Sequence, residues 1–179
     1  MRKVNWADVS EAKDFDRPIP GAYIAVIKNV EDVESKEYLK LEWDFAEGQF
    51  KDNNFETYER AGFWPLALIR SYKEKALPFF KAFKTALEDS NRGFVFDEDN
   101  LRGMIGKKIG VILGEEEYKK NDGSTGKRLY VAQTRSIEAI QKGDFTVPTL
   151  KKLAAPASGG YYADAQFASV DDNDGELPF

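Results

Sequence analysis

The alternation of apolar and polar residues between about Glu37 and Glu47 constrains the fold of this chain most strongly. Successive side chains of a β-strand point to opposite faces, so a period of two predicts a strand with one face in the core and one toward solvent. The inward face is predicted to carry Leu39, Leu41, Trp43 and Phe45, and the outward face Tyr38, Lys40, Glu42 and Asp44. A chain organised around such strands is mainly β.

Other segments carry strand patterns of varying clarity. A strand that begins at Gly21 has apolar residues on both faces, as a central strand does. Phe55 to Arg60, after a loop at 48–54, is predicted to form a third strand, and Ala61 to Leu77 is left unassigned because Pro65 interrupts it. Lys107 to Tyr118 and Arg128 to Ser136 are predicted to form two more strands, joined by a hairpin with a long projecting tip at 119–127.

Helical patterns occupy two places. After Pro78, which suits a first helical turn, four apolar residues recur at helical spacing up to the helix end at Asn91 or Gly93. A short helix is predicted from Ile137 to Lys142, ended by Gly143. The stripe of the longer helix is predicted to enter the core and comprises Phe79, Phe80, Phe83 and Leu87; Asp97 or Asp99 is predicted to cap a turn before Leu101.

The order is therefore three strands, a helix and two strands, with long loops after strands one and four. This order matches a five-stranded OB-fold barrel with one helix between strands 3 and 4, and the alternative is an SH3-like or irregular small barrel. We expect a lead-in segment at residues 1–20, the barrel domain at 21–153 and a tail at 154–179, where Ala, Gly, Ser, Pro and acids replace the strand pattern. From about residue 154 onward we expect disorder.

The chain contains no cysteine and no histidine. Thiolate metal sites and cysteine nucleophiles are thereby excluded, and so is the commonest general base at neutral pH. The acidic run Asp97-Glu98-Asp99 would suit Mg²⁺ in a nuclease, but helix capping explains it better. We therefore expect no enzyme activity, no cofactor and no metal.

The charge is distributed unevenly along the chain. The formal net charge is −5, yet residues 101–152 hold 11 basic and 6 acidic residues, and residues 156–179 hold five acids and no base. Lysines can simply solvate a surface, but a local basic stripe is also what nucleic acid requires, because counterion release is a local event. The sequence thus places a basic block before an acidic tail.

The hairpin concentrates cations between two tyrosines. Single-stranded nucleic acid requires such an arrangement, because each base offers a face for stacking and each nucleotide carries a phosphate. In OB domains, the loop between strands four and five and the face of strands two and three bind the strand. The predicted DNA-binding residues are Tyr38, Lys40, Lys107, Lys108, Tyr118, Lys119, Lys120, Lys127, Arg128, Tyr130 and Arg135. The alternative is a solvated hairpin whose tyrosines cover the end of the barrel.

The C-terminus ends in acids followed by Leu-Pro-Phe. It resembles the tail tip of bacterial single-stranded DNA-binding proteins, although Gly175 and Glu176 interrupt the run of acids. The resemblance implies that Phe179 docks into an apolar pocket of replication or repair proteins while the acids meet basic residues at its rim. The predicted partner-binding residues are Asp171, Asp172, Asp174, Glu176, Leu177, Pro178 and Phe179.

A second resemblance spans about residues 20–153. The strings Leu39-Lys40-Leu41-Glu42-Trp43-Asp44-Phe45, Gly106-Lys107-Lys108-Ile109-Gly110-Val111 and Gly143-Asp144-Phe145-Thr146-Val147-Pro148 occur in the order found in a family of phage proteins. That family, from phages of Gram-positive bacteria, is regarded as OB-fold single-stranded DNA-binding proteins of replication and recombination.

The resemblance implies sequence-tolerant binding of single-stranded DNA during phage DNA replication, recombination or repair, with partner proteins recruited through the tail. We expect a cytoplasmic protein without a membrane partner, since no apolar stretch is long enough to span a bilayer. The sequence is compatible with a monomer and with a homo-oligomer. The alternative is a protein–protein adaptor whose barrel binds no nucleic acid.

Overall fold

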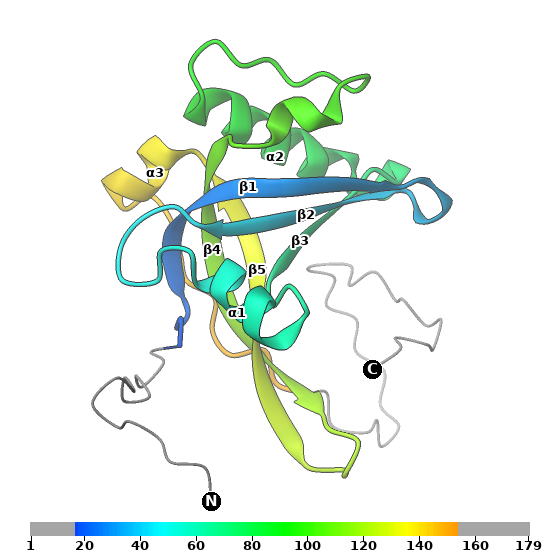
Figure 1. The fold of residues 1–179 in the computed structure, drawn as a ribbon, viewed down its shortest axis with the longest axis vertical. Coiled ribbons are helices and arrows are strands. Elements are labelled where there is room, and N and C mark those ends of the chain that lie inside the picture. The colour runs from blue at the N-terminus through cyan, green and yellow to red at the C-terminus, as the bar shows by residue number, and fades with distance from the viewer. Residues whose placement is uncertain (1–16, 154–179) are drawn as a thin grey trace, which may run out of the picture.

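Strand β1 (Gly21–Val33) lies at the centre of a five-stranded antiparallel sheet. The structure is a computed structural model and describes residues 17–153. β1 pairs with β2 (Tyr38–Phe45) on one side and with β4 (Lys108–Lys119) on the other. β3 (Ala67–Ser71) and β5 (Thr125–Arg135) form the two edges, which gives the order β3-β2-β1-β4-β5 (Figure 1).

Three α-helices connect or follow these strands. α1 (Asn53–Ala61) lies between β2 and β3, and α2 (Leu77–Ser90) lies between β3 and β4, as the helical spacing predicts. α3 (Ile137–Lys142) follows β5 and ends at Gly143, which confirms its prediction. No helix within residues 17–153 has the length and apolar character needed to cross a membrane. Single turns of 3₁₀ helix occupy Glu34–Lys36, Glu74–Ala76 and Leu101–Met104.

The core lies between the curved sheet and α2. The inward residues of β2 are all buried, which confirms the alternation that predicts this strand, and those of β4 meet them across β1. Phe83 and Leu87 of α2 are fully buried, but Phe79 is 60% exposed, so its assignment to the core was wrong. Phe79 lies in the first turn of α2, where Leu77 is about half exposed as well, so the core covers the start of the helix less than its middle. The shared core comprises Leu39, Leu41, Trp43, Phe45, Phe83, Leu87, Ile109, Val111 and Leu113.

The two edge strands approach each other without pairing. Among residues 17–153 the backbone makes no ladder between β3 and β5, so the sheet is open there. Arg70 Nη2 on β3 instead donates to Thr134 Oγ1 on β5 at 3.3 Å, and the guanidinium lies over the ring of Phe83, 5.7 Å from its centroid. Burial lowers the pKa of Arg70 to about 10, and the arginine remains the side-chain link across this seam.

The third strand lies later in the sequence than predicted. Phe55 to Arg60 belongs to α1, and the third strand is β3, in the segment left unassigned. The hairpin tip is also shorter than predicted, because β4 continues to Lys119 and β5 begins at Thr125. Before Leu101, Asp97 Oδ1 accepts from Asp99 N at 2.9 Å, which confirms that Asp97 caps a turn there. The capping position of the 3₁₀ helix itself is held by Asn100, without a side-chain hydrogen bond.

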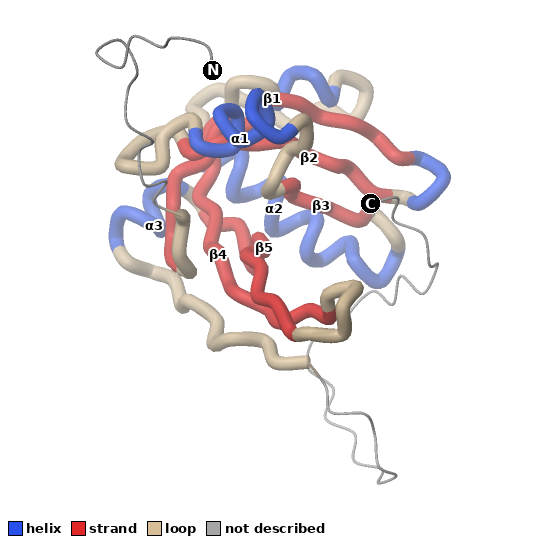
Figure 2. The backbone as a smooth tube through the Cα atoms, turned by 60° about the horizontal axis from the view of Figure 1, so that its bottom comes forward, coloured by secondary structure: helices blue, strands red, loops and turns tan. Residues whose placement is uncertain are grey.

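The chain after α3 returns along the outer side of β4 (Figure 2). Lys151 N donates to Glu115 O at 3.0 Å, and Glu117 N donates to Lys151 O at 2.9 Å. This short parallel bridge pairs with β4 at Glu115 to Glu117, past Leu113, where its pairing with the first residue of β1 stops. Without the bridge, the backbone groups of β4 on this side would have no partner. It also places Leu153, the last described residue, beside the β4–β5 hairpin; the predicted tail, with its partner-binding residues, lies outside the described residues.

Candidate nucleic-acid interface

An open groove of about 1020 Å³ runs between α1 and the base of the β4–β5 hairpin. We call it the hairpin groove. This volume lies at the upper limit for sites of single drug-sized ligands, so the groove has room for a segment of a polymer. One wall comes from α1 and the loop after it, the other from the hairpin, and the chain entering β1 closes one side. The lining residues used below are Arg17, Asn53, Thr57, Arg60, Phe63, Glu115, Lys127, Arg128 and Leu129.

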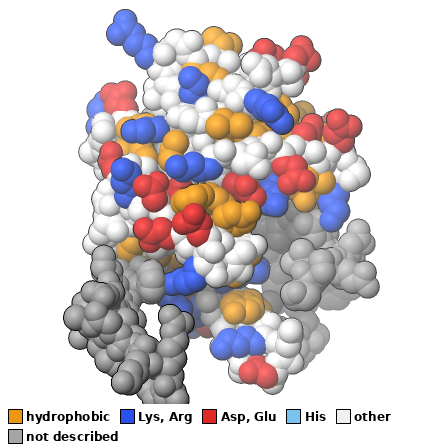
Figure 3. Space-filling model, viewed as in Figure 1, with side chains coloured by type: hydrophobic (Ala, Val, Ile, Leu, Met, Phe, Trp, Pro, Cys, Tyr) orange, Lys and Arg blue, Asp and Glu red, His pale blue; other side chains and the backbone are white. Residues whose placement is uncertain are grey.

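Positive charge predominates in the hairpin groove. Of the described residues 17–153, four cations line it, namely Arg17, Arg60, Lys127 and Arg128, together with one carboxylate, that of Glu115. Figure 3 shows Lys and Arg side chains in the hollow between the body of the molecule and the hairpin tip. An excess of cations in a concave site concentrates anions there, because the low-dielectric walls focus the field. The groove therefore suits a polyanion.

Two ion pairs hold the two hairpin cations in place. Lys127 Nζ lies 3.5 Å from Glu115 Oε2, and Arg128 Nε donates to Glu116 Oε1 at 2.7 Å. The side chains of both cations are more than half exposed. The carboxylates are less exposed than the cations, at 32% for Glu115 and 16% for Glu116, and Lys151 Nζ lies 3.8 Å from Glu116 Oε2. A phosphate can replace Glu115 beside Lys127 at small cost, and Glu116 keeps Lys151 as a cation if Arg128 binds a phosphate instead.

The two hairpin tyrosines cover glycines on the neighbouring strand. A Cβ at Gly126 would lie 2.8 Å from the ring of Tyr118, and a Cβ at Gly114 would lie 2.9 Å from the ring of Tyr130. Both rings are half-buried on the outer face of the hairpin, and burial together with Glu116 raises the pKa of Tyr130. The guanidinium of Arg128 lies 5.6 Å from the centroid of Tyr118. One face of each ring is thus used by the hairpin itself.

The structure divides the eleven predicted DNA-binding residues into two sets. Six lie on the hairpin, where Lys119 and Lys120 are exposed at its tip. The other five lie elsewhere: Tyr38 and Lys40 at the start of β2, and Lys107, Lys108 and Arg135 at the end of β4 and β5 opposite to the tip. Lys40 Nζ is 3.6 Å from Glu31 Oε2, and Lys107 Nζ lies 5.1 Å from the centroid of Phe94.

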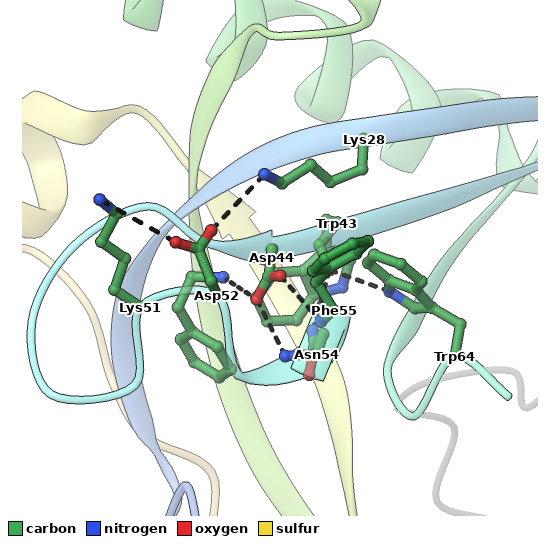
Figure 4. Close-up of polar contacts among 9 residues, drawn as sticks. Lys28, Trp43, Asp44, Lys51, Asp52, Asn54, Phe55 and Trp64 are labelled. Atoms are coloured by element: carbon green, nitrogen blue, oxygen red, sulfur yellow. Dashed lines mark hydrogen bonds and ion pairs between the residues drawn. The ribbon is translucent and has the colours of Figure 1, made fainter. Parts of the chain in front are cut away.

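A buried carboxylate fixes α1, and with it one wall of the groove. Asp44 of β2 is fully buried, although the alternation predicts that it faces solvent. Its Oδ1 accepts from Phe45 N at 2.8 Å and Asn54 N at 3.0 Å, and its Oδ2 accepts from Phe55 N at 2.9 Å (Figure 4). Burial raises the pKa of Asp44, and the three N–H donors oppose this rise.

Two further hydrogen bonds attach α1 and the loop after it to β2. Asn54 Nδ2 and Trp64 Nε1 both donate to the carbonyl oxygen of Trp43, at 2.9 and 3.0 Å (Figure 4). The start of α1 and the loop after α1 are therefore both attached to β2. The groove wall that they form is fixed before any ligand arrives.

Two cations and one aromatic residue of the groove, Arg17, Arg60 and Phe63, were not among the predicted DNA-binding residues. Arg17 precedes β1, Arg60 lies in the last turn of α1, and Phe63 follows the glycine that terminates that helix. The sequence signal available for Arg60 and Phe63 was a cation and an aromatic residue on either side of Gly62, but Arg60 was predicted to end a strand and Phe63 lay in the unassigned segment. The groove is built from parts of the chain that only the tertiary structure brings together.

Comparison with known proteins adds no family to these observations. No protein family matches this sequence, and no curated protein is significantly similar to it. Among residues 17–153, no three Asp or Glu side chains are grouped closely enough to hold a metal ion. The groove and its charges are therefore the features of the molecule that indicate a function.

Proposed function

We propose that the protein binds single-stranded DNA, without strong sequence preference, in the hairpin groove. The observation that carries this proposal is the open groove with four cations and one carboxylate between α1 and the hairpin. Phosphates would replace Glu115 and Glu116 as partners of Lys127 and Arg128. Contacts to phosphates position a strand and carry no sequence information, so such binding tolerates any sequence.

The strand order supports an OB-type barrel as the scaffold. An OB fold has the same strand order, β3-β2-β1-β4-β5, and the same helix between β3 and β4. In a closed OB barrel, the outer strands β3 and β5 lie next to each other. Successive antiparallel pairings make β3 and β5 run in the same direction. We infer that the seam bridged by Arg70 and Thr134 is the closure of this barrel, made by side chains and α2 instead of a backbone ladder.

The first prediction concerns salt. If the four groove cations neutralise about four phosphates, the single-strand slope of about −0.7 per phosphate predicts roughly fifty-fold weaker binding for a four-fold rise in salt. Fluorescence anisotropy of a labelled oligo-dT at two salt concentrations measures this loss, and a duplex of the same length is the control. Affinity that does not change with salt would contradict the proposal.

We further propose that the C-terminal tail recruits replication or recombination proteins. This rests on the acidic Leu-Pro-Phe ending and on its resemblance to bacterial single-stranded DNA-binding proteins. Deletion of Phe179 alone is expected to abolish pull-down of such partners, because a short segment with one aromatic anchor loses most of its apolar contact. DNA affinity should stay unchanged, and a variant that still captures its partners would refute the role of Phe179.

A second candidate function is protein–protein adaptation. Phe55 and Tyr58 on α1 and Ile69 on β3 are large apolar side chains that are about half exposed. Exposed apolar groups of this kind also occur at protein interfaces. The adaptor predicts a stable protein complex and no affinity for oligonucleotides, so the salt titration distinguishes the two functions.

A further inference from the structure

Phe63 presents an exposed aromatic ring at the wall of the hairpin groove. Its side chain is 59% exposed, and it lies on the α1 side of the groove, whereas Lys127 and Arg128 lie on the hairpin side. The groove thus has an aromatic ring on one wall and the ammonium group of Lys127 on the other, while the guanidinium of Arg128, the next residue of β5, is held by Glu116 beside the ring of Tyr118. A nucleotide has the same division, since its base is flat and apolar on both faces and its phosphate is charged.

The backbone on both sides of Phe63 is fixed, so the exposure of its ring is built into the fold. Gly62 has a φ of +76°, ends α1, and donates its N–H to Tyr58 O at 2.8 Å. On the other side, Trp64 donates to Trp43 O and packs against the ring of Tyr58, with 5.7 Å between centroids. With both neighbours anchored, the ring of Phe63 has no route into the core.

We propose that Phe63 is a base-stacking residue of the hairpin groove and that it selects unpaired over paired nucleic acid. The inference rests on the proposed binding of single-stranded DNA. Stacking on Phe63 requires a base face that is free, and duplex bases already stack on their neighbours. Every base has such a face, so the contact favours single strands without selecting a sequence.

Two oligonucleotides of equal length test this role: oligo-dT and a strand whose sugars carry no bases. Phe63→Ala is expected to weaken binding of oligo-dT by about tenfold and to leave binding of the abasic strand unchanged. Neutralising Lys127 should weaken binding of both strands, because both carry the same phosphates. Phe63→Ala weakening both strands equally, or neither, would overturn the stacking role.

Two further variants separate stacking from general apolar contact and from damage to the fold. Phe63→Leu keeps the apolar character but removes the flat ring, and it should bind oligo-dT as weakly as Phe63→Ala does; full rescue by leucine would overturn the inference. Phe79→Ala removes an equally exposed ring from α2 and should leave affinity unchanged. Failure of the wild-type protein to bind either strand would instead refute the proposed function, and with it this inference.

Discussion

Replacing both Lys127 and Arg128 by glutamine is expected to weaken binding of single-stranded DNA by about fifty-fold at a salt concentration of about 0.05 M. The two cations account for half of those that line the groove. Removing two phosphate contacts lowers the single-strand salt slope by about 1.4, from about −2.8 to about −1.4. The variant should therefore lose only about sevenfold in affinity for a four-fold rise in salt.

The matched control is the double substitution Lys107→Gln and Lys108→Gln. It makes the same charge change on the same strand pair, but at the end of β4 opposite to the hairpin tip. Sequence alone places all four residues in one DNA-binding set, whereas the structure places only Lys127 and Arg128 in the groove. Anisotropy titrations with oligo-dT should show wild-type affinity for the control. Equal losses in both double variants would show that the net charge, and not the groove, attracts DNA.

Local periodicity was sufficient to predict most of the sheet. β2 was predicted from its alternating sequence, and the apolar residues of that alternation, from Leu39 to Phe45, are buried as expected. Such strands have one solvent-facing and one buried face, so apolar and polar residues alternate within the strand itself, and the strand can be recognised from its local sequence. The helix α2 was predicted for the same reason, since Phe83 and Leu87 lie on its buried face.

The segment between β2 and α2 was mispredicted because its structure depends on a distant residue. Asp44 binds the N–H groups of Asn54 and Phe55, about ten residues later, and thereby supports a helix where a strand was predicted. The alternation gives no sign of this, since it places Asp44 on the solvent face. β3 has only five residues and follows Pro65 closely, which leaves too short a pattern to recognise.

The candidate site was predicted only where its residues are close in sequence. Lys127 and Arg128 belong to one hairpin, so a cluster of cations there is visible in the sequence. Arg17, Arg60 and Phe63 come from two other segments, and their place in the groove depends on how α1 packs against β2. A groove with walls from three segments has no signature in any one of them.

Asp44→Ala is expected to lower the free energy of unfolding by at least about 3 kcal/mol. The substitution leaves three backbone N–H groups, two of them buried, without their acceptor, and each such donor costs about 1–3 kcal/mol. Asp44→Asn should cost less, about 1–2 kcal/mol, because the amide oxygen can still accept from Phe45 and Asn54 while its NH₂ group faces the N–H of Phe55. Urea denaturation followed by circular dichroism measures both losses.

Asp52 provides the matched control for this prediction. It occupies the capping position directly before α1, yet its side chain makes no capping hydrogen bond and instead lies 3.6 Å from Lys28 Nζ and 3.9 Å from Lys51 Nζ. Exposed ion pairs contribute little, and asparagine tolerates the left-handed backbone of this position, where φ is +60°, as aspartate does, so Asp52→Asn should lower stability by less than about 1 kcal/mol. If Asp52→Asn and Asp44→Ala lost equal stability, the anchor of α1 would not be the buried carboxylate of β2. If Asp44→Ala also weakened binding of oligo-dT while the chain stayed folded, the groove would depend on α1 being held in place.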